Sequence, residues 1–184
     1  MEEVMHPSRR RTIVLIGMMG AGKSTTGFGL AQKLGIKFVD SDRELERLES
    51  RTVQEIFEQK GEEYFKELEK KIIKKILNTT KPQVLSVGGN SLDDDELLKT
   101  IKEKTISVFL DVDLDTLIKR VERRNNRPVL NGKDKAEAMR DIYENRYPIY
   151  SKSDIVVNTT YLNKDTTTNV IMQLISDFIN NYKD

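Results

Sequence analysis

An early part of the chain reads Gly17-Met18-Met19-Gly20-Ala21-Gly22-Lys23-Ser24, which fits the P-loop pattern G-x-x-x-x-G-K-[ST]. The apolar run before it, Thr12–Ile16, predicts a short buried strand, and Thr25–Leu34 after it spaces its apolar residues as a helix does. Glycines let backbone N–H groups close around phosphate oxygens, and a helix N-terminus adds partial positive charge. Together they predict a nucleoside triphosphate site; a glycine turn before a purely structural helix explains the full pattern less well.

The polar residues of this motif have distinct expected tasks. Lys23 would reach the β- and γ-phosphates, and the Ser24 hydroxyl would ligate Mg²⁺. The expected nucleotide contacts within the motif come from Gly20, Ala21, Gly22, Lys23, Ser24 and Thr25.

Composition sets wide limits on the function. The 184 residues suffice for one domain with its own core, and a net charge of +1 argues against a dedicated nucleic-acid binder. The absence of Cys excludes a disulfide framework and thiolate chemistry, and it fits a cytoplasmic protein. No apolar run has the length of a membrane span. We therefore expect a cytoplasmic monomer that binds neither nucleic acid nor membrane.

The chain is expected to form a flexible basic tail over 1–11, where no signal-peptide pattern follows the arginines, and a single domain over 12–184. Short apolar runs alternate with helical patterns in that domain, which is typical of a parallel α/β sheet. The expected strands are Thr12–Gly17, Lys37–Asp40, Val84–Val87, Ile106–Asp111 and Ile155–Asn158. A helical insertion is expected over about 41–78, and a last helix near Thr166–Tyr182 is expected to cover the sheet.

The segment from Arg123 to Lys135 has a different character. It is polar and basic and contains Pro128 and Gly132, which is typical of a loop between helices. Near phosphates such a loop can close over the nucleotide. We therefore expect a mobile lid over about 123–135.

Two carboxylates, Asp40 and Asp42, end the second expected strand, at the edge where ligands bind in open α/β sheets. Asp40 could hold Mg²⁺ through water, and Asp42 could accept the proton of an acceptor hydroxyl. A helix cap at Ser41 or Asp42 explains the spacing equally well. Asp111, which ends another apolar run, is a rival metal ligand, although a strand end before a cap at Asp113 explains it at least as well.

Cations and a glycine pair complete the candidates. A transferring phosphoryl group and an acidic acceptor both require cations. The candidates, each more typical of a solvated surface when taken singly, are Lys66, Arg120, Arg123, Arg124, Arg127 and Arg146. Gly88-Gly89-Asn90 follows the third expected strand, where the two glycines either let backbone N–H groups approach an anion or form an ordinary turn.

In combination and order, these motifs resemble the shikimate kinase family over about Thr12–Asn158. The segments that carry the resemblance are 17–25, 40–42 (Asp-Ser-Asp), 61–69 (Gly-Glu-Glu-Tyr-Phe-Lys-Glu-Leu-Glu), 85–90 (Leu-Ser-Val-Gly-Gly-Asn), 126–130 (Asn-Arg-Pro-Val-Leu) and 146–150 (Arg-Tyr-Pro-Ile-Tyr). The resemblance implies an α/β, three-layer P-loop kinase fold with a five-stranded parallel sheet, a helical substrate-binding insertion and a mobile lid. It also implies transfer of the ATP γ-phosphate to the 3-hydroxyl of shikimate, in aromatic amino-acid biosynthesis.

For the nucleotide side, the resemblance implies that Arg127 reaches ATP phosphates from the lid and that Arg120 lies close to the nucleotide. Ser24 and Asp40 match the magnesium positions, which favours Asp40 over Asp111. Lys23 and Arg127 then belong to the catalytic group together with Asp42, the candidate base.

For the acceptor side, the resemblance implies that Asp42 contacts the shikimate hydroxyls, that Arg146 holds the carboxylate, and that Gly88 and Gly89 border the substrate. Lys66 stands where the family usually has an arginine that clamps the carboxylate.

Two residues depart from the family pattern, and both belong to the acceptor side. Lys66 keeps the charge of the usual arginine but loses its planar two-point grip. Asn90 replaces a glycine; Asn tolerates left-handed backbone angles, but its side chain can crowd the site. We expect Lys66 and Arg146 to converge on the carboxylate, with Glu69 orienting Lys66.

Two alternatives stay open. One is a related small-molecule kinase, such as a gluconate kinase. The other is a degenerate shikimate-kinase-like protein that binds nucleotide without phosphorylating an acceptor.

Overall fold

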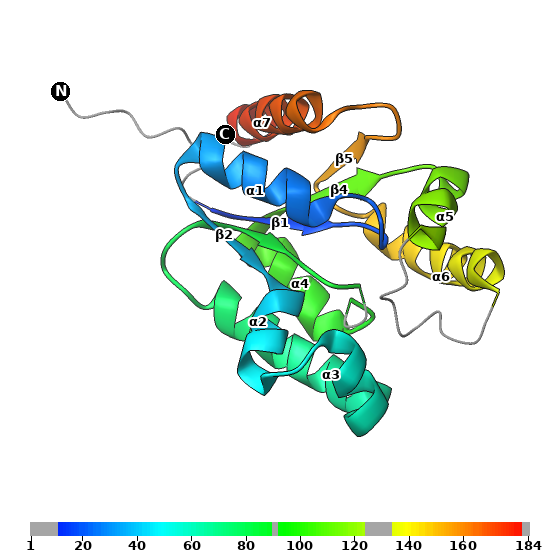
Figure 1. The fold of residues 1–184 in the computed structure, drawn as a ribbon. Coiled ribbons are helices and arrows are strands. Elements are labelled where there is room, and N and C mark those ends of the chain that lie inside the picture. Colours follow the sequence, from blue (N-terminus) through cyan, green and yellow to red (C-terminus); the bar gives the residue numbers. More distant parts are fainter. Residues whose placement is uncertain (1–10, 90–91, 124–133, 182–184) are drawn as a thin grey trace.

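The computed structural model describes residues 11–89, 92–123 and 134–181. Within them one parallel sheet is formed by β1 (Thr12–Ile16), β2 (Lys37–Asp40), β3 (Gln83–Ser86), β4 (Thr105–Asp111) and β5 (Ile155–Asn158). The strand order is β2-β3-β1-β4-β5 (Figure 1). The expected five-stranded parallel sheet is confirmed, and each strand begins and ends within one residue of its expected bounds.

Burial explains the apolar runs of the strands. Strand β1 lies at the centre, where Val14 is in register with Leu85 of β3 and Ser107 of β4. Helices cover both faces of the sheet, so the inner strands need apolar side chains on both sides. Strand β5 lies at an edge and alternates buried with exposed residues.

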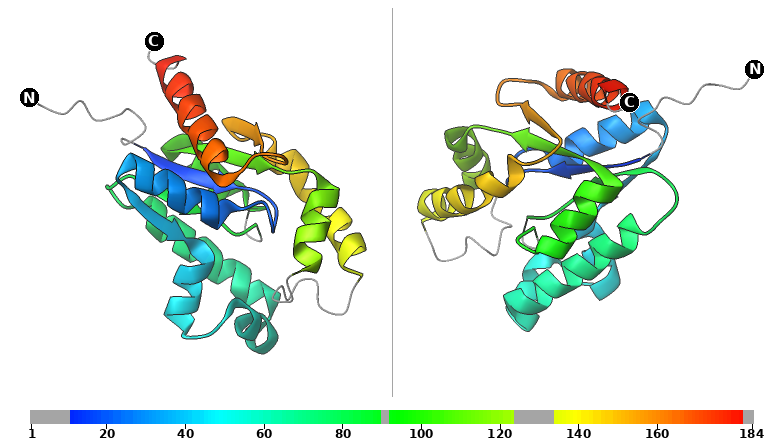
Figure 2. Two further views of the ribbon diagram at one scale, coloured as in Figure 1. Left: turned by 45° about the horizontal axis from the view of Figure 1, so that its top comes forward. Right: turned by 180° about the vertical axis from the view of Figure 1, so that it is seen from behind.

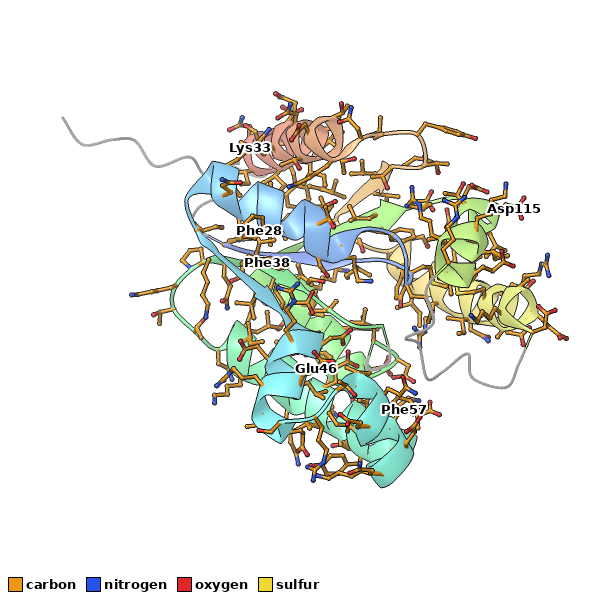
Figure 3. The ribbon with its side chains drawn as sticks, in the orientation of Figure 1. Phe28, Lys33, Phe38, Glu46, Phe57 and Asp115 are labelled. Atoms are coloured by element: carbon orange, nitrogen blue, oxygen red, sulfur yellow. The ribbon has the colours of Figure 1, made fainter. Side chains whose placement is uncertain are left out.

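The helices that flank the sheet are α1 (Lys23–Leu34), α4 (Asp95–Lys104), α5 (Leu114–Glu122), α6 (Lys135–Tyr150) and α7 (Lys164–Asn181). α1 and α7 pack together on one face and α4 lies on the other (Figures 1 and 2). Right-handed crossovers produce this division, because the connection from β1 to β2 and that from β3 to β4 run toward opposite edges. Phe28 of α1 packs edge-on against Phe38 of β2, with ring centroids 6.5 Å apart (Figure 3).

Helices α2 (Ser41–Glu49) and α3 (Val53–Leu77) form the expected helical part between β2 and β3 and pack against each other. Thr52 and Glu55 begin α3 with a reciprocal capping box, and α3 bends at Gly61, where φ is 84°. The two helices share a small core of their own, made of Leu45, Ile56, Phe65 and Ile72. This part therefore has a separate apolar anchor beside the sheet.

Some expectations fall at the limits of the described residues. The lid expected over 123–135 and the tail over 1–11 lie almost entirely outside them. The last helix begins at Lys164, slightly before its expected start at Thr166. In the parts of the chain that the structure describes, no helix combines the length and apolar character needed to cross a bilayer.

Candidate active site

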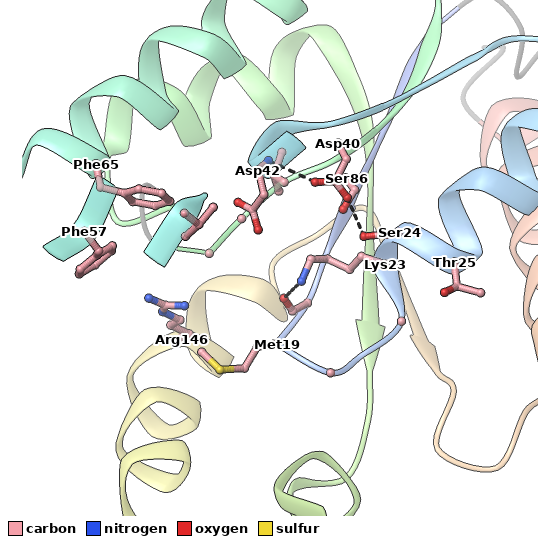
Figure 4. A pocket seen from close by; sticks show the side chains of 17 residues that line it. Met19, Lys23, Ser24, Thr25, Asp40, Asp42, Phe57, Phe65, Ser86 and Arg146 are labelled. Carbon is pink, nitrogen blue, oxygen red and sulfur yellow. Dashed lines mark hydrogen bonds between the residues drawn. The ribbon is translucent and has the colours of Figure 1, made fainter. Parts of the chain in front are cut away.

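A pocket lies at the carboxyl-terminal edge of the sheet, where open α/β proteins bind ligands (Figure 4). Its walls come from the P-loop, the β2–α2 junction, the first half of α3, the end of β3, and α6. Lys23 and Ser24 point into it from the P-loop, and Asp42 and Arg146 line it from the other elements. The sheet thus brings together residues from widely separated parts of the sequence.

The P-loop has the backbone that its sequence predicts. Gly22 is the N-cap of α1 with φ 90°, a left-handed angle that side chains disfavour, so the helix begins directly at the loop. The Lys23 ammonium donates to the carbonyl oxygens of Gly17 (2.7 Å) and Met18 (3.2 Å). Arg120 of α5 donates from Nη1 to the Gly20 carbonyl at 3.1 Å. A cation from α5 therefore lies against the loop, in addition to the lysine of the motif.

Asp40 connects the P-loop to the start of α2. Its Oδ2 accepts a 2.6 Å hydrogen bond from the Ser24 hydroxyl, and its Oδ1 accepts one from the Asp42 backbone N–H at 3.1 Å. The N-cap of α2 is therefore Asp40, so the interpretation of Ser41 or Asp42 as the cap is wrong. The physical reason is that Asp40 is the last residue of β2 and has extended backbone angles, as an N-cap residue does, whereas Ser41 is already the first residue of α2. The Asp42 side chain lines the pocket.

Asp111 lies elsewhere. It is absent from the pocket lining, and burial raises the pKa of its carboxyl. Asp113 caps α5, as the alternative explanation of this segment predicts. Ser24 and Asp40, and not Asp111, are therefore the pair of oxygen-bearing side chains that the structure brings together in the pocket.

The glycine pair after β3 lies directly against polar and charged side chains. A Cβ on Gly88 would overlap Oε1 of Glu69 and lie 2.9 Å from Oδ1 of Asp42. A Cβ on Gly89 would overlap the Tyr150 hydroxyl and lie 2.5 Å from Nη1 of Arg146. A side chain at either position would therefore force these neighbouring side chains to move.

Three buried polar groups of this region were missed or only partly interpreted from the sequence. Ser41 is fully buried, and its hydroxyl accepts a 2.9 Å hydrogen bond from the Gly88 N–H. Glu69 is also fully buried. Burial raises the pKa of the Tyr150 hydroxyl, the Arg146 charge lowers it, and the Glu69 charge raises it. No local pattern predicts these contacts, because each joins segments far apart in the chain.

Apolar side chains form part of the pocket wall. Val53, Phe57 and Phe65 of α3 and Met19 of the P-loop line the pocket (Figure 4). Phe57 and Phe65 contact each other with ring centroids 5.1 Å apart. Helical periodicity identifies Phe65 as part of an apolar face but cannot indicate that this face borders a pocket.

Lys66 does not lie where the sequence predicts it. It is not among the described residues that line the pocket; its ammonium pairs with Glu62 at 3.2 Å and with Asp93 at 3.6 Å. Its expected pairing with Glu69 is wrong, because Glu69 points into the buried interior while Lys66 faces the side of α3 toward Asp93. Arg127 and Asn90 lie outside the described residues, as does Arg124.

Comparison with known proteins agrees with this geometry. The family model described as shikimate kinase matches residues 19–176. A shikimate kinase of Caulobacter vibrioides is 40% identical over 153 residues, which cover 83% of this chain and 76% of the relative. The structure of shikimate kinase from Acinetobacter baumannii in complex with shikimate superposes with a TM-score of 0.88 at 30% identity, covering 96% of this chain and 97% of the other.

A gluconokinase from Sinorhizobium meliloti shares the fold with a TM-score of 0.56 at 15% identity, covering 96% of this chain and 99% of the other. At that identity the likeness concerns the fold alone. The match to the shikimate kinase family model, by contrast, extends across nearly the whole described chain. The chain belongs to the shikimate kinase family.

Proposed function

We propose that this chain transfers the γ-phosphate of ATP to the 3-hydroxyl of shikimate, with Mg²⁺ as cofactor. The observation that carries the proposal is that one pocket is lined by the P-loop and by Asp42 and Arg146. Membership of the shikimate kinase family supports the identity of the acceptor.

On the nucleotide side, backbone N–H groups of the loop and the N-terminus of α1 would bind the phosphates. Lys23 would stabilise the charge that develops on the transferring group, because its ammonium already lies inside the loop. Arg120 would remain beside the nucleotide, and Arg127 would reach the phosphates from the lid.

Ser24 and Asp40 would hold Mg²⁺. Two protein oxygens suit this ion, which usually keeps several waters and binds through one or two carboxylates plus substrate phosphates. Their 2.6 Å separation and position in the pocket fit that donor set. Within the described ranges, no cluster of three or more His, Cys, Asp or Glu side chains is placed so that it could bind a metal ion without substrate. When bound, Mg²⁺ supplies neutralisation of the β- and γ-phosphate charge.

In the chemical step, the acceptor oxygen attacks the γ-phosphorus, and its proton passes to a carboxylate oxygen of Asp42. The bond between the γ-phosphorus and the β–γ bridging oxygen breaks, and ADP leaves. Arg146 would bind the acceptor carboxylate through its planar guanidinium, which matches carboxylate geometry. Gly88 and Gly89 would border the acceptor, where a larger residue would displace Glu69, Tyr150 or Arg146.

The deciding experiment measures ADP release with shikimate, with gluconate and without acceptor. Shikimate alone is expected to stimulate ADP release, and the product should be shikimate 3-phosphate by mass and phosphorus NMR. Stimulation by gluconate instead would support the related-kinase alternative. Nucleotide binding without stimulation by either acceptor would support the degenerate alternative.

A further inference from the structure

A second cavity lies on the face of the sheet that α4 covers (Figure 2). Its walls come from α4, from the end of α6 with the turn that follows it, and from β1 and β4. Its volume of about 410 Å³ is in the range of small-molecule sites. None of the described residues that line it also lines the active-site pocket. We call it the α4 cavity; the proposed reaction does not use it.

The floor of the α4 cavity is apolar. It consists of the aliphatic side chains of Ile16, Leu98, Ile101 and Ile149. Ile16 and Ile101 belong to the buried core, whereas Leu98 and Ile149 are half-buried at its edge. Apolar surface that is recessed in this way suits the apolar body of a small molecule.

The wall formed by α4 changes character along the helix. Asp95, Leu98, Lys99 and Lys102 are spaced as one helical face, and all four line the cavity. With a rise of 1.5 Å per residue, Asp95 and Lys102 lie about 10 Å apart along the helix axis. The wall therefore has a carboxylate at one end, a leucine in the middle and cations at the other end.

The cations of this cavity are not explained by α4 alone. Asp95 and Lys102 complement the dipole of α4, which would account for them without a ligand. Lys152, however, belongs to the turn after α6 and lines the same cavity. No ion pair joins Lys102 or Lys152 to a carboxylate of the described residues, and Lys99 approaches Glu103 only to 3.9 Å. Since an ammonium has three donors and no acceptor, these lysines can bind an anion.

The turn that carries Lys152 is fixed to the sheet below it. Oδ2 of Asp154 accepts hydrogen bonds from the Ser107 backbone N–H at 2.8 Å and from the Ser107 hydroxyl at 2.7 Å. The same hydroxyl accepts one from the Asp154 backbone N–H at 2.9 Å. Ser107 and Asp154 thus satisfy each other, and the lysines are the cavity's donors for a ligand.

We propose that the α4 cavity binds a small organic monoanion, with its apolar body on the aliphatic floor and its acidic group at Lys102 and Lys152. Asp93 and Asp95, which line the opposite end, would repel a second anionic group. The site therefore disfavours nucleotides and dicarboxylates and differs in its chemistry from the P-loop. This inference does not depend on the identity of the acceptor.

The test uses 1-anilinonaphthalene-8-sulfonate, an aromatic monoanion whose fluorescence rises in apolar surroundings. It is titrated into the parent protein with Mg²⁺, ADP and shikimate at saturation, so that the active site is occupied. We expect saturable binding to one site per chain. Lys102→Met combined with Lys152→Met should raise the Kd about 2- to 30-fold, because two exposed ion pairs are lost.

The matched control is Lys71→Met combined with Lys81→Met. These two exposed lysines line neither cavity, so their removal changes the net charge equally and should leave the Kd unchanged. Equal Kd values in the two double variants would overturn the proposal, because the probe would then respond only to the overall charge. Absence of saturable binding to the parent would overturn it too.

The position of the probe is tested separately by NMR with isoleucine methyl groups labelled. We expect intermolecular NOEs between the aromatic protons of the probe and the methyl groups of Ile101 and Ile149. NOEs only to isoleucines outside the α4 cavity would contradict the proposed site.

Discussion

The nucleotide half of the pocket is built mainly from consecutive residues, whereas the acceptor half is assembled from α2, α3, the end of β3 and α6. In the P-loop the groups proposed to bind the nucleotide are backbone N–H groups and two adjacent side chains, Lys23 and Ser24, which the turn and the start of α1 place together. In the acceptor half, Asp42, Gly88 and Arg146 are neighbours only because the sheet and the helices pack as they do. Changes in the first half should therefore affect chemistry with little dependence on distant packing, and changes in the second should affect acceptor binding.

The strongest test of the nucleotide half is Lys23→Ala. An arginine finger, which stabilises the charge of the same transferring group, contributes about 10³–10⁵-fold to kcat, and we take this range for the P-loop lysine. We expect kcat, measured by steady-state ADP release, to fall by a factor in that range. The melting temperature should stay close to that of the parent. A variant that retains near-normal turnover would show that the P-loop lysine does not act on the phosphates.

The next largest effect is expected where the two halves meet, at Asp42. Asp42→Asn keeps the size of the side chain, but the amide cannot accept a proton. Loss of a general base typically lowers the reaction rate about 10²–10⁴-fold. The transition state of phosphoryl transfer is often loose, so positioning of the acceptor contributes much of the catalysis. Part of the lost activity can therefore appear as a higher KM for shikimate. An unchanged kcat/KM would exclude Asp42 as the base. Asp40→Asn is the matched control, since it should instead change the Mg²⁺ dependence.

Arg146→Met probes the acceptor half alone. A charge-assisted hydrogen bond contributes roughly 1.5–3 kcal/mol, which corresponds to about 10- to 100-fold in binding. The KM for shikimate should rise by this factor while the KM for ATP changes little. Equal increases in both constants would contradict the division of the pocket into two halves.

Gly89→Ala should give the smallest effect, through packing. The added methyl group would meet the Tyr150 hydroxyl and the Arg146 guanidinium, so Arg146 must move away from its position in the pocket. We expect the KM for shikimate to rise by up to about tenfold, since only part of the arginine's hydrogen bonding is lost. Gly29→Ala in α1 is the control, because its nearest neighbour is the flexible end of Lys164, and it should leave both KM values unchanged. An unaltered KM in Gly89→Ala would show that Arg146 tolerates the displacement.

Much of the fold could be predicted from the sequence, because apolar runs and helical periodicity report burial directly. The five strands are each within one residue of their expected bounds. The detail of the β2–α2 junction could not be predicted, because Ser41, Asp42 and Asp40 are all good cap residues and only the end of the strand selects Asp40.

The acceptor side shows the same limit more strongly. The types of residues there could be predicted, but their partners could not. Glu62, Glu69 and Asp93 are all carboxylates within reach of Lys66 by sequence or by fold, and only the packing of α3 on its neighbours turns Glu69 inward and leaves the other two beside the lysine.

By itself, the sequence determined the P-loop, the parallel sheet and the family, because each depends on patterns within short segments or on their order. Tertiary structure alone decided that Asp40 joins Ser24 to α2, that Ser41 accepts from Gly88, and that Lys66 is held by Glu62 and Asp93. The physical reason is that a turn or a helix is specified by neighbours along the chain. A hydrogen bond or ion pair between distant segments exists only once their packing has brought the two groups within about 3–4 Å.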